Sequence, residues 1–239
     1  MRETRDIGAK VEGWRPPARP GRLPLDGRYA RLEPLSPDAH AAQLFKANST
    51  SDAIWDFLPY GPFASAAAYH RWMRDATAGD DPLFFAILNR DTGQWEGVAS
   101  YLRIQPEAGS IEIGHINLSP ALARTRAATE ALFLMMQWAF DAGYRRLEWK
   151  CDARNLASRR AAERLGLSYE GTFRQAAVVK GRNRDTAWFA AIDTEWPALK
   201  EAFLAWLAPA NFDAAGRQRE RLGDLTRLVR VADDPALRG

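Results

Sequence analysis

The pattern of apolar and polar positions changes partway along the chain. Between residues 83 and 118 short apolar-rich runs are separated by turn-forming residues at 91–93 and 106–109. Such runs with hairpin-length turns between them predict antiparallel strands. We expect these strands at residues 83–89, 96–104 and 110–118.

After Pro120 the spacing becomes helical. Ala128, Leu132, Met135 and Ala139 follow one another at intervals of three or four, which predicts a helix over residues 128–140 that ends at Gly143. The remaining helices are expected at 37–47, 65–78, 155–165 and 196–207. The remaining strands are expected at 28–33, 147–151, 169–175 and 186–192.

This order of elements, β-α-α-β-β-β-α-β-α-β-β-α, predicts an α/β fold with a mixed sheet and flanking helices. One helix joins the strands at 110–118 and 147–151, so those two strands should be parallel and the others antiparallel. The domain is expected at residues 27–209, after an irregular N-terminal arm at 1–26. The C-terminal tail, 210–239, is either a docked helix or a frayed end.

Composition excludes several classes of protein. The chain has 239 residues, of which 46% are hydrophobic, enough for one full core. It has no apolar run of membrane-spanning length, and its first residues lack the apolar stretch of a secretory signal, so we expect a soluble cytoplasmic protein without membrane contact. A single cysteine, Cys151, and three histidines argue against a disulfide or a metal site.

The net charge of +3 conceals an asymmetry. Residues 144–184 hold 11 Lys or Arg against 4 Asp or Glu, a net charge of +7. Residues 29–120 hold 6 against 11, a net charge of −5. One part of the molecule therefore suits an anion and the other a cation, unless both charges are merely solvated surface.

Two predicted helix starts carry candidate binding residues. The unpaired N–H groups and the dipole of a helix start bind phosphate, and small residues let it approach. An ordinary start with exposed arginines is the alternative at the first of them. The residues there are Arg124, Thr125, Arg126, Ala127, Ala128 and Thr129. At the second, Asn155 is a suitable N-cap, and Asn155 and Ser158 could instead face a ligand.

The strand at 110–118 carries two candidate general bases, Glu112 and His115. Strand alternation places them on opposite faces unless a bulge intervenes. Glu112 is the more unusual residue for an apolar strand, where burial would raise its pKa toward a useful range. A structural histidine is the ordinary alternative for His115.

Together these motifs resemble the GNAT superfamily of N-acetyltransferases, and within it the branch of ribosomal-protein N-terminal acetyltransferases. The resemblance covers about residues 28–196. Its most specific parts are Thr129-Glu130-Ala131, Asn155 with Ser158, and Arg164-Leu165-Gly166. It implies a GNAT-like mixed, mostly antiparallel sheet with a splayed central parallel pair, and acetyl-CoA as the acetyl donor.

The resemblance also implies roles for residues. The thioester and pantetheine would lie in the splayed gap beside the backbone of Asn117 and Leu118, where an N–H stabilises the oxyanion. Asn155 would contact pantetheine, and Ser158 would protonate the leaving thiolate. The chain departs from the family at two positions. Arg126 replaces a glycine, so residue 126 must have ordinary helical dihedrals. Arg164 replaces a tyrosine that many relatives use as a general acid.

The predicted function is transfer of an acetyl group to a primary amine, of a small molecule or a protein N-terminus, by direct attack in a ternary complex. The acidic segment would suit a protonated amine, and the basic segment the cofactor phosphates. The alternative is a catalytically weak acyl-CoA-binding or regulatory module. The arginines gather at a phosphate-type turn, so we expect no nucleic-acid partner, in a monomer or homodimer. Aromatic residues between 55 and 72 either seal the core or wall the acceptor pocket.

Overall fold

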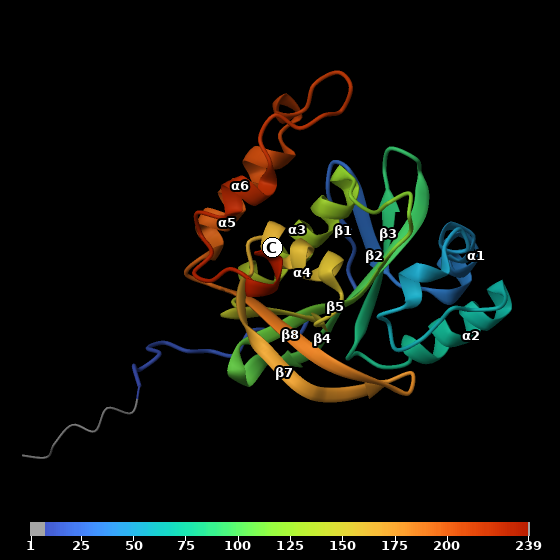
Figure 1. Ribbon diagram of the computed structural model, residues 1–239, viewed down its shortest axis with the longest axis horizontal. Coiled ribbons are helices and arrows are strands. Elements are labelled where there is room, and N and C mark those ends of the chain that lie inside the picture. The colour runs from blue at the N-terminus through green and yellow to red at the C-terminus, as the bar shows by residue number, and fades with distance from the viewer. Residues whose placement is uncertain (1–7, 239) are drawn as a thin grey trace, which may run out of the picture.

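The computed structural model describes residues 8–238 and is built on one eight-stranded sheet of order β1-β2-β3-β4-β5-β6-β8-β7 (Figure 1). Neighbouring strands are antiparallel except β5 and β6, so the mixed, mostly antiparallel sheet expected from the sequence is confirmed. The strands are Leu25–Asp26 (β1), Ala30–Pro34 (β2), Leu83–Asn89 (β3), Gln94–Gln105 (β4), Ser110–Leu118 (β5), Arg146–Asp152 (β6), Ser168–Val179 (β7) and Arg182–Ile192 (β8).

The helices α1 to α4 begin at residues whose side chains cap them. The side chains of Ser36, Ser65, Thr125 and Asn155 each accept a first-turn N–H that has no acceptor within its helix. The helices are Pro37–Asn48 (α1), Ala66–Ala76 (α2), Arg126–Asp141 (α3), Leu156–Arg164 (α4), Trp196–Leu207 (α5) and Leu222–Thr226 (α6). Within residues 8–238, no helix is long and apolar enough to cross a membrane.

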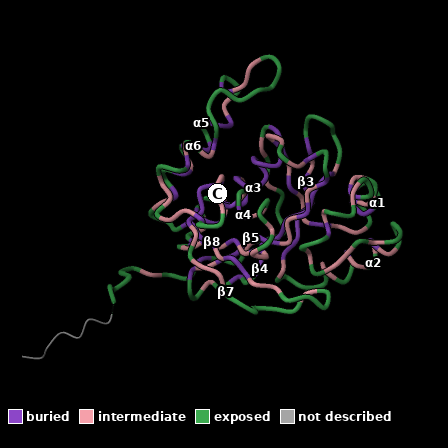
Figure 2. The backbone as a smooth tube through the Cα atoms, in the orientation of Figure 1, coloured by how far each residue is buried: buried purple, intermediate pink, exposed green. Residues whose placement is uncertain are grey.

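Two buried clusters hold the elements together (Figure 2). The larger lies between α3, α5 and the sheet, and the fully buried Ala131, Met135 and Ala139 face it at helical spacing. The smaller lies under α1 and α2, which pack together at one end of the molecule (Figure 1). This second cluster positions the loop between α1 and α2, which borders the candidate site.

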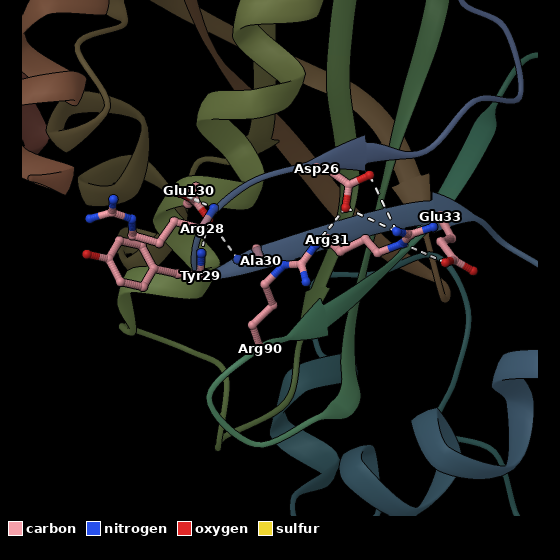
Figure 3. A network of polar contacts seen from close by, with 8 residues as sticks. All are labelled: Asp26, Arg28, Tyr29, Ala30, Arg31, Glu33, Arg90 and Glu130. Carbon is pink, nitrogen blue, oxygen red and sulfur yellow. Dashed lines mark hydrogen bonds and ion pairs between the residues drawn. The ribbon is translucent and has the colours of Figure 1, made fainter.

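Glu130 of α3 fastens the start of β2 to the helix (Figure 3). Its carboxylate is buried and accepts three backbone N–H groups, from Arg28 (3.0 Å), Tyr29 (2.5 Å) and Ala30 (2.7 Å). A side chain at Gly27 would collide with this carboxylate, so glycine is required for the close approach. The Thr-Glu-Ala segment noticed in the sequence therefore contributes a fold-stabilising acid.

The C-terminal segment packs against α4. Asp234 is fully buried and forms a two-pronged ion pair with Arg159 of α4, with both N–O distances 2.5 Å. Thr226 of α6 donates a hydrogen bond to the carbonyl of Arg164, at the end of the same helix. The C-terminal segment thus holds α4 in place, and the first residues of α4 face the candidate site.

The hairpin of β7 and β8 is longer than the strands predicted at 169–175 and 186–192. It turns at Lys180 and Gly181, whose φ angles of 49° and 72° are typical of a tight two-residue turn. Residues 173–178 are exposed, so this part of the hairpin shows no apolar alternation. The hairpin extends toward the loop after α1, where the Lys180 Nζ donates to the Trp55 carbonyl (2.8 Å).

Candidate active site

The parallel strands β5 and β6 pair only over their first residues. Their pairing ends at Glu112 opposite Glu148, and beyond it the two strands separate. A cavity of about 440 Å³ fills the opening. Its walls come from β5, β6, the start of α4 and the 53–59 loop, and Arg184 of β8 also reaches it.

A bulge in β5 brings both candidate bases to this cavity. Val98 of β4 pairs with Asn117, and Ser100 pairs with Gly114, so β5 contains one more residue than β4 over this stretch. His115 has a φ of 50°, which marks the irregularity. The extra residue reverses the alternation, and Glu112 and His115 both line the cavity.

Glu112 lies at the point where the strands part and is only 3% exposed. Its Oε2 is 3.0 Å from the Lys150 Nζ and 2.7 Å from an Arg103 guanidinium nitrogen. Lys150 also contacts Glu148 (2.6 Å) and lies 3.7 Å from the centre of the Trp188 ring. Burial raises the pKa of the Glu112 carboxyl, and the two cations oppose that rise. Both ion pairs use Oε2, which leaves Oε1 for another partner.

His115 is held between aromatic rings. It stacks on Tyr60 with ring centres 5.6 Å apart and contacts Phe84 at 5.1 Å. Its buried Nδ1 has no hydrogen-bond partner among the described residues. Burial, and then the charges of Arg103 and Arg184, lower the His115 pKa to about 4, so the ring is neutral at pH 7.

The start of α4 forms another wall of the cavity. The Asn155 Oδ1 caps the helix by accepting the N–H of Ser158 (3.0 Å), which is the structural role expected for it. The Ser158 hydroxyl accepts the Trp149 indole N–H (3.0 Å) and can still donate its own proton. Cys151 lies next to it, and burial raises the pKa of this thiol to about 11, so it is an unreactive thiol at neutral pH.

The predicted phosphate-binding segment and the last two residues of β5, Asn117 and Leu118, do not line this cavity. Arg126 is the first residue of α3 and has helical dihedrals, as its position required, whereas Arg124 adopts φ 67°. The Arg126 guanidinium lies between the rings of Tyr29 (4.7 Å) and Phe212 (4.6 Å). Arg126 therefore presents its backbone rather than its charge at the helix start.

Asn117 is 3% exposed, and neither polar atom of its side chain has a hydrogen-bond partner in residues 8–238. Buried amides are normally satisfied, so this one is suited to a ligand. Its neighbour Leu118 pairs with Gly97 of β4. The site residues predicted from sequence thus divide between the cavity, which contains Glu112, His115, Asn155 and Ser158, and the segments Asn117–Leu118 and Arg124–Thr129.

The opposite end of the cavity is formed by the segment that follows α1. Trp55 of this segment is buried in the second apolar cluster, whereas Phe57 is 39% exposed and lines the cavity with Leu58. The aromatic residues therefore divide between the two predicted roles. The hydrogen bond from Lys180 to the Trp55 carbonyl joins this segment to the β7–β8 hairpin.

The expectation of acidic walls is wrong. The charged residues lining the cavity are three cations, Arg103, Lys150 and Arg184, and two acids, Glu112 and Asp152. The acids of residues 29–120 are mostly elsewhere, because segment composition does not fix which way side chains point. The sequence analysis did not single out Arg103, Lys150 and Arg184, which lie on three different strands that only the sheet register brings together.

Comparisons with known proteins agree with this geometry. A family model described as an acetyltransferase (GNAT) domain matches residues 30–168. A GCN5-related N-acetyltransferase from Brucella melitensis is 49% identical, with a TM-score of 0.89 over 91% of this chain and 100% of that one. A probable GNAT-family acetyltransferase from Chromobacterium violaceum is 44% identical, with a TM-score of 0.76 over 80% and 96% of the two chains. No match was found among curated proteins.

The sheet opens within its parallel pair over a cavity with candidate proton acceptors, and the similar proteins identify the chain as an acetyltransferase. The chain belongs to the GNAT family of N-acetyltransferases, which use acetyl-CoA and an amine acceptor. The ribosomal L7/L12 alpha-N-protein acetyltransferase RimL shares the fold at 20% identity, with a TM-score of 0.61 over 71% of this chain and 94% of that one. The described residues contain no group of side chains suited to a metal ion.

Proposed function

We propose that this protein transfers an acetyl group from acetyl-CoA to a primary amine by direct attack within a ternary complex. The observation that carries the proposal is the single cavity across the opened β5–β6 pair. It contains a carboxylate and an imidazole on β5 and a hydroxyl at the start of α4. A proton acceptor and a proton donor thus line one cavity of about 440 Å³.

The cofactor would extend from this cavity to the start of α3. The pyrophosphate would bind the first-turn N–H groups of Arg126 and Ala127, since Thr125 already accepts that of Ala128 (3.1 Å). Pantetheine would contact the unpartnered amide of Asn117. Backbone groups of Asn117 and Leu118 would then lie beside the thioester, where an N–H would stabilise the oxyanion.

The chain's residues would then move two protons. The neutral amine attacks the thioester carbonyl carbon, a C–N bond forms, and the carbonyl electrons collapse to expel the CoA thiolate. The Oε1 of Glu112 accepts the amine proton, directly or through water, while Lys150 and Arg103 hold Oε2. Ser158 donates its proton to the thiolate and regains one from water, while Glu112 releases the amine proton to water, so both groups return to their starting states. His115 is the alternative acceptor, because it lines the same cavity and its Nδ1 has no partner among the described residues.

The first experiment separates an enzyme from a binding module. Thermal unfolding is measured with acetyl-CoA, free CoA and ATP. A ligand at a hundred times its Kd stabilises by about 2.7 kcal/mol, so both CoA species should shift the midpoint and ATP should not. Thiol release with a panel of primary amines then tests turnover. Binding without turnover on any amine would favour the binding module, and no binding at all would refute the site.

A further inference from the structure

We infer that the acceptor is a small primary amine that also carries an anionic group, a carboxylate or a phosphate, and that Arg184 binds this group. The inference rests on the proposed acetyl transfer and names its substrate class. The observation behind it is a cationic side chain in the cavity that has no ion-pair or hydrogen-bond partner among the described residues.

The other cations of the cavity are already neutralised. Lys150 lies between the carboxylates of Glu112 (3.0 Å) and Glu148 (2.6 Å). Arg103 directs one guanidinium nitrogen to Glu112 (2.7 Å). These contacts hold the proton acceptor in place and account for the charges at the closed end of the strand opening.

Arg184 is different, although it lines the same cavity. Among residues 8–238 no carboxylate lies within 4.0 Å of its guanidinium, and its Nε is buried without a hydrogen-bond acceptor. A buried charged donor without an acceptor is costly, so such a group is normally completed by a ligand or water. The planar guanidinium matches the geometry of carboxylate and phosphate oxygens.

The position of Arg184 places the anion near the reacting amine. Arg184 lines the cavity together with His115 of β5 and Cys151 of β6, which belong to the two walls of the opening. A cavity of about 440 Å³ must also hold the thioester, so the amine and the anion are separated by only a few atoms. Phe57 and Leu58 at the loop end of the cavity suit an apolar side chain on such a molecule.

The proposal differs from acetylation of a protein N-terminus. In a protein N-terminus, the carbon that bears the amine is followed by a neutral peptide bond in place of a carboxylate. Such a substrate offers the Arg184 guanidinium no charged partner at this position. A polyamine or amino sugar would add positive charge to a cavity that already holds an unpaired cation. Each of these alternatives predicts a substrate preference that differs from the one proposed, so the test can distinguish them.

The test compares amines with and without the anion, and kcat/KM is calculated for the neutral, unprotonated amine because the anion also changes the amine pKa. Thiol release from acetyl-CoA is measured with phenylalanine, phenylalaninamide and phenethylamine, and with phosphoethanolamine against ethanolamine. We expect kcat/KM for one of the anionic amines to exceed that of its neutral counterpart by roughly 10- to 100-fold, the value of a charge-assisted contact. A preference for phosphoethanolamine would identify the anion as phosphate.

Arg184→Met should reduce this ratio to near 1, while Arg182→Met should keep it. Arg182 is exposed on the same strand and does not line the cavity, which makes it the matched control. Equal kcat/KM for anionic and neutral amines in the wild-type enzyme, or a preference for the amide, would overturn the inference while leaving acetyl transfer in place.

A binding measurement separates this failure from failure of the proposed function. Free CoA is added in excess, and the additional thermal stabilisation by phenylalanine, phosphoethanolamine and their neutral counterparts is recorded without turnover. Stabilisation by an anionic amine alone, lost in Arg184→Met, would support anion recognition even in an inactive protein. Equal stabilisation by both members of each pair would contradict it.

Discussion

Replacing Glu130 with alanine should destabilise the protein far more than an ordinary helix substitution. The carboxylate is the acceptor for the N–H groups of Arg28, Tyr29 and Ala30, and Tyr29 and Ala30 are 7% and 0% exposed (Figure 3). Each buried N–H left without an acceptor costs about 1–3 kcal/mol. Two such groups give a loss of about 4 kcal/mol in the free energy of unfolding.

The assay is urea unfolding followed by tryptophan fluorescence. Glu130→Gln keeps one side-chain oxygen but loses the charge, so its stability should fall between wild type and Glu130→Ala. Glu201→Ala is the matched control, because Glu201 is exposed on α5 and should change stability by less than about 0.5 kcal/mol.

The result also distinguishes a structural from a cofactor role. Glu130 belongs to the motif that resembles the family's phosphate turn, yet its carboxylate faces β2. At a temperature where the variant is folded, its Kd for acetyl-CoA should stay within about twofold of wild type. A loss of stability below about 1 kcal/mol, or a loss of acetyl-CoA binding with stability retained, would refute the reasoning.

Three further predictions follow from contacts in and behind the site. Glu112→Gln should reduce kcat about 100-fold or more and flatten its pH dependence, whereas an unchanged profile would assign the proton to His115. The pKa of His115 is about 4 in the folded protein against an ordinary 6.5, so the unfolded chain binds the proton first as the pH falls. The free energy of unfolding should therefore fall by up to about 3 kcal/mol as the pH is lowered from 6.5 to 4. In urea unfolding measured over this pH range, His115→Asn should lack this loss. The same loss in the variant as in the wild type would contradict the assignment. Asp234→Ala leaves Arg159 buried and unpaired, so the free energy of unfolding should fall by about 3–5 kcal/mol. Hydrogen exchange in residues 222–237 should become faster. Exchange at the wild-type rate would mean that the ion pair does not hold this segment.

The elements that face the core could be predicted from the sequence. The strands between residues 83 and 118 are largely buried on both faces, so they appear in the sequence as apolar-rich runs between turn residues. The helix at 126–141 buries apolar residues at helical spacing, which the sequence also shows. The parallel pair followed from the single helix between its strands. The outer part of the β7–β8 hairpin was missed because both its faces are exposed, so no apolar alternation marks it.

The site could be predicted only in part. Glu112 was noticed because an acid in an apolar strand is unusual, but its partners Arg103 and Lys150 lie on neighbouring strands. Their contacts depend on sheet register, which no local pattern gives. The same holds for Glu130, whose backbone partners are about a hundred positions away in the chain. For the bulge at His115 the sequence offered only the neighbouring Gly114, since a glycine inside a strand often marks a bulge but does not fix its position.

The bulge in β5 has a consequence for how this chain can vary in evolution. One extra residue between Gly114 and Asn117 sets which side chains beyond it share a face with Glu112. A single deletion there would restore regular alternation and move His115 to the other face, even with every remaining residue unchanged. Working relatives should therefore differ in length in the loops around this strand, while the strand itself tolerates substitutions but neither insertions nor deletions.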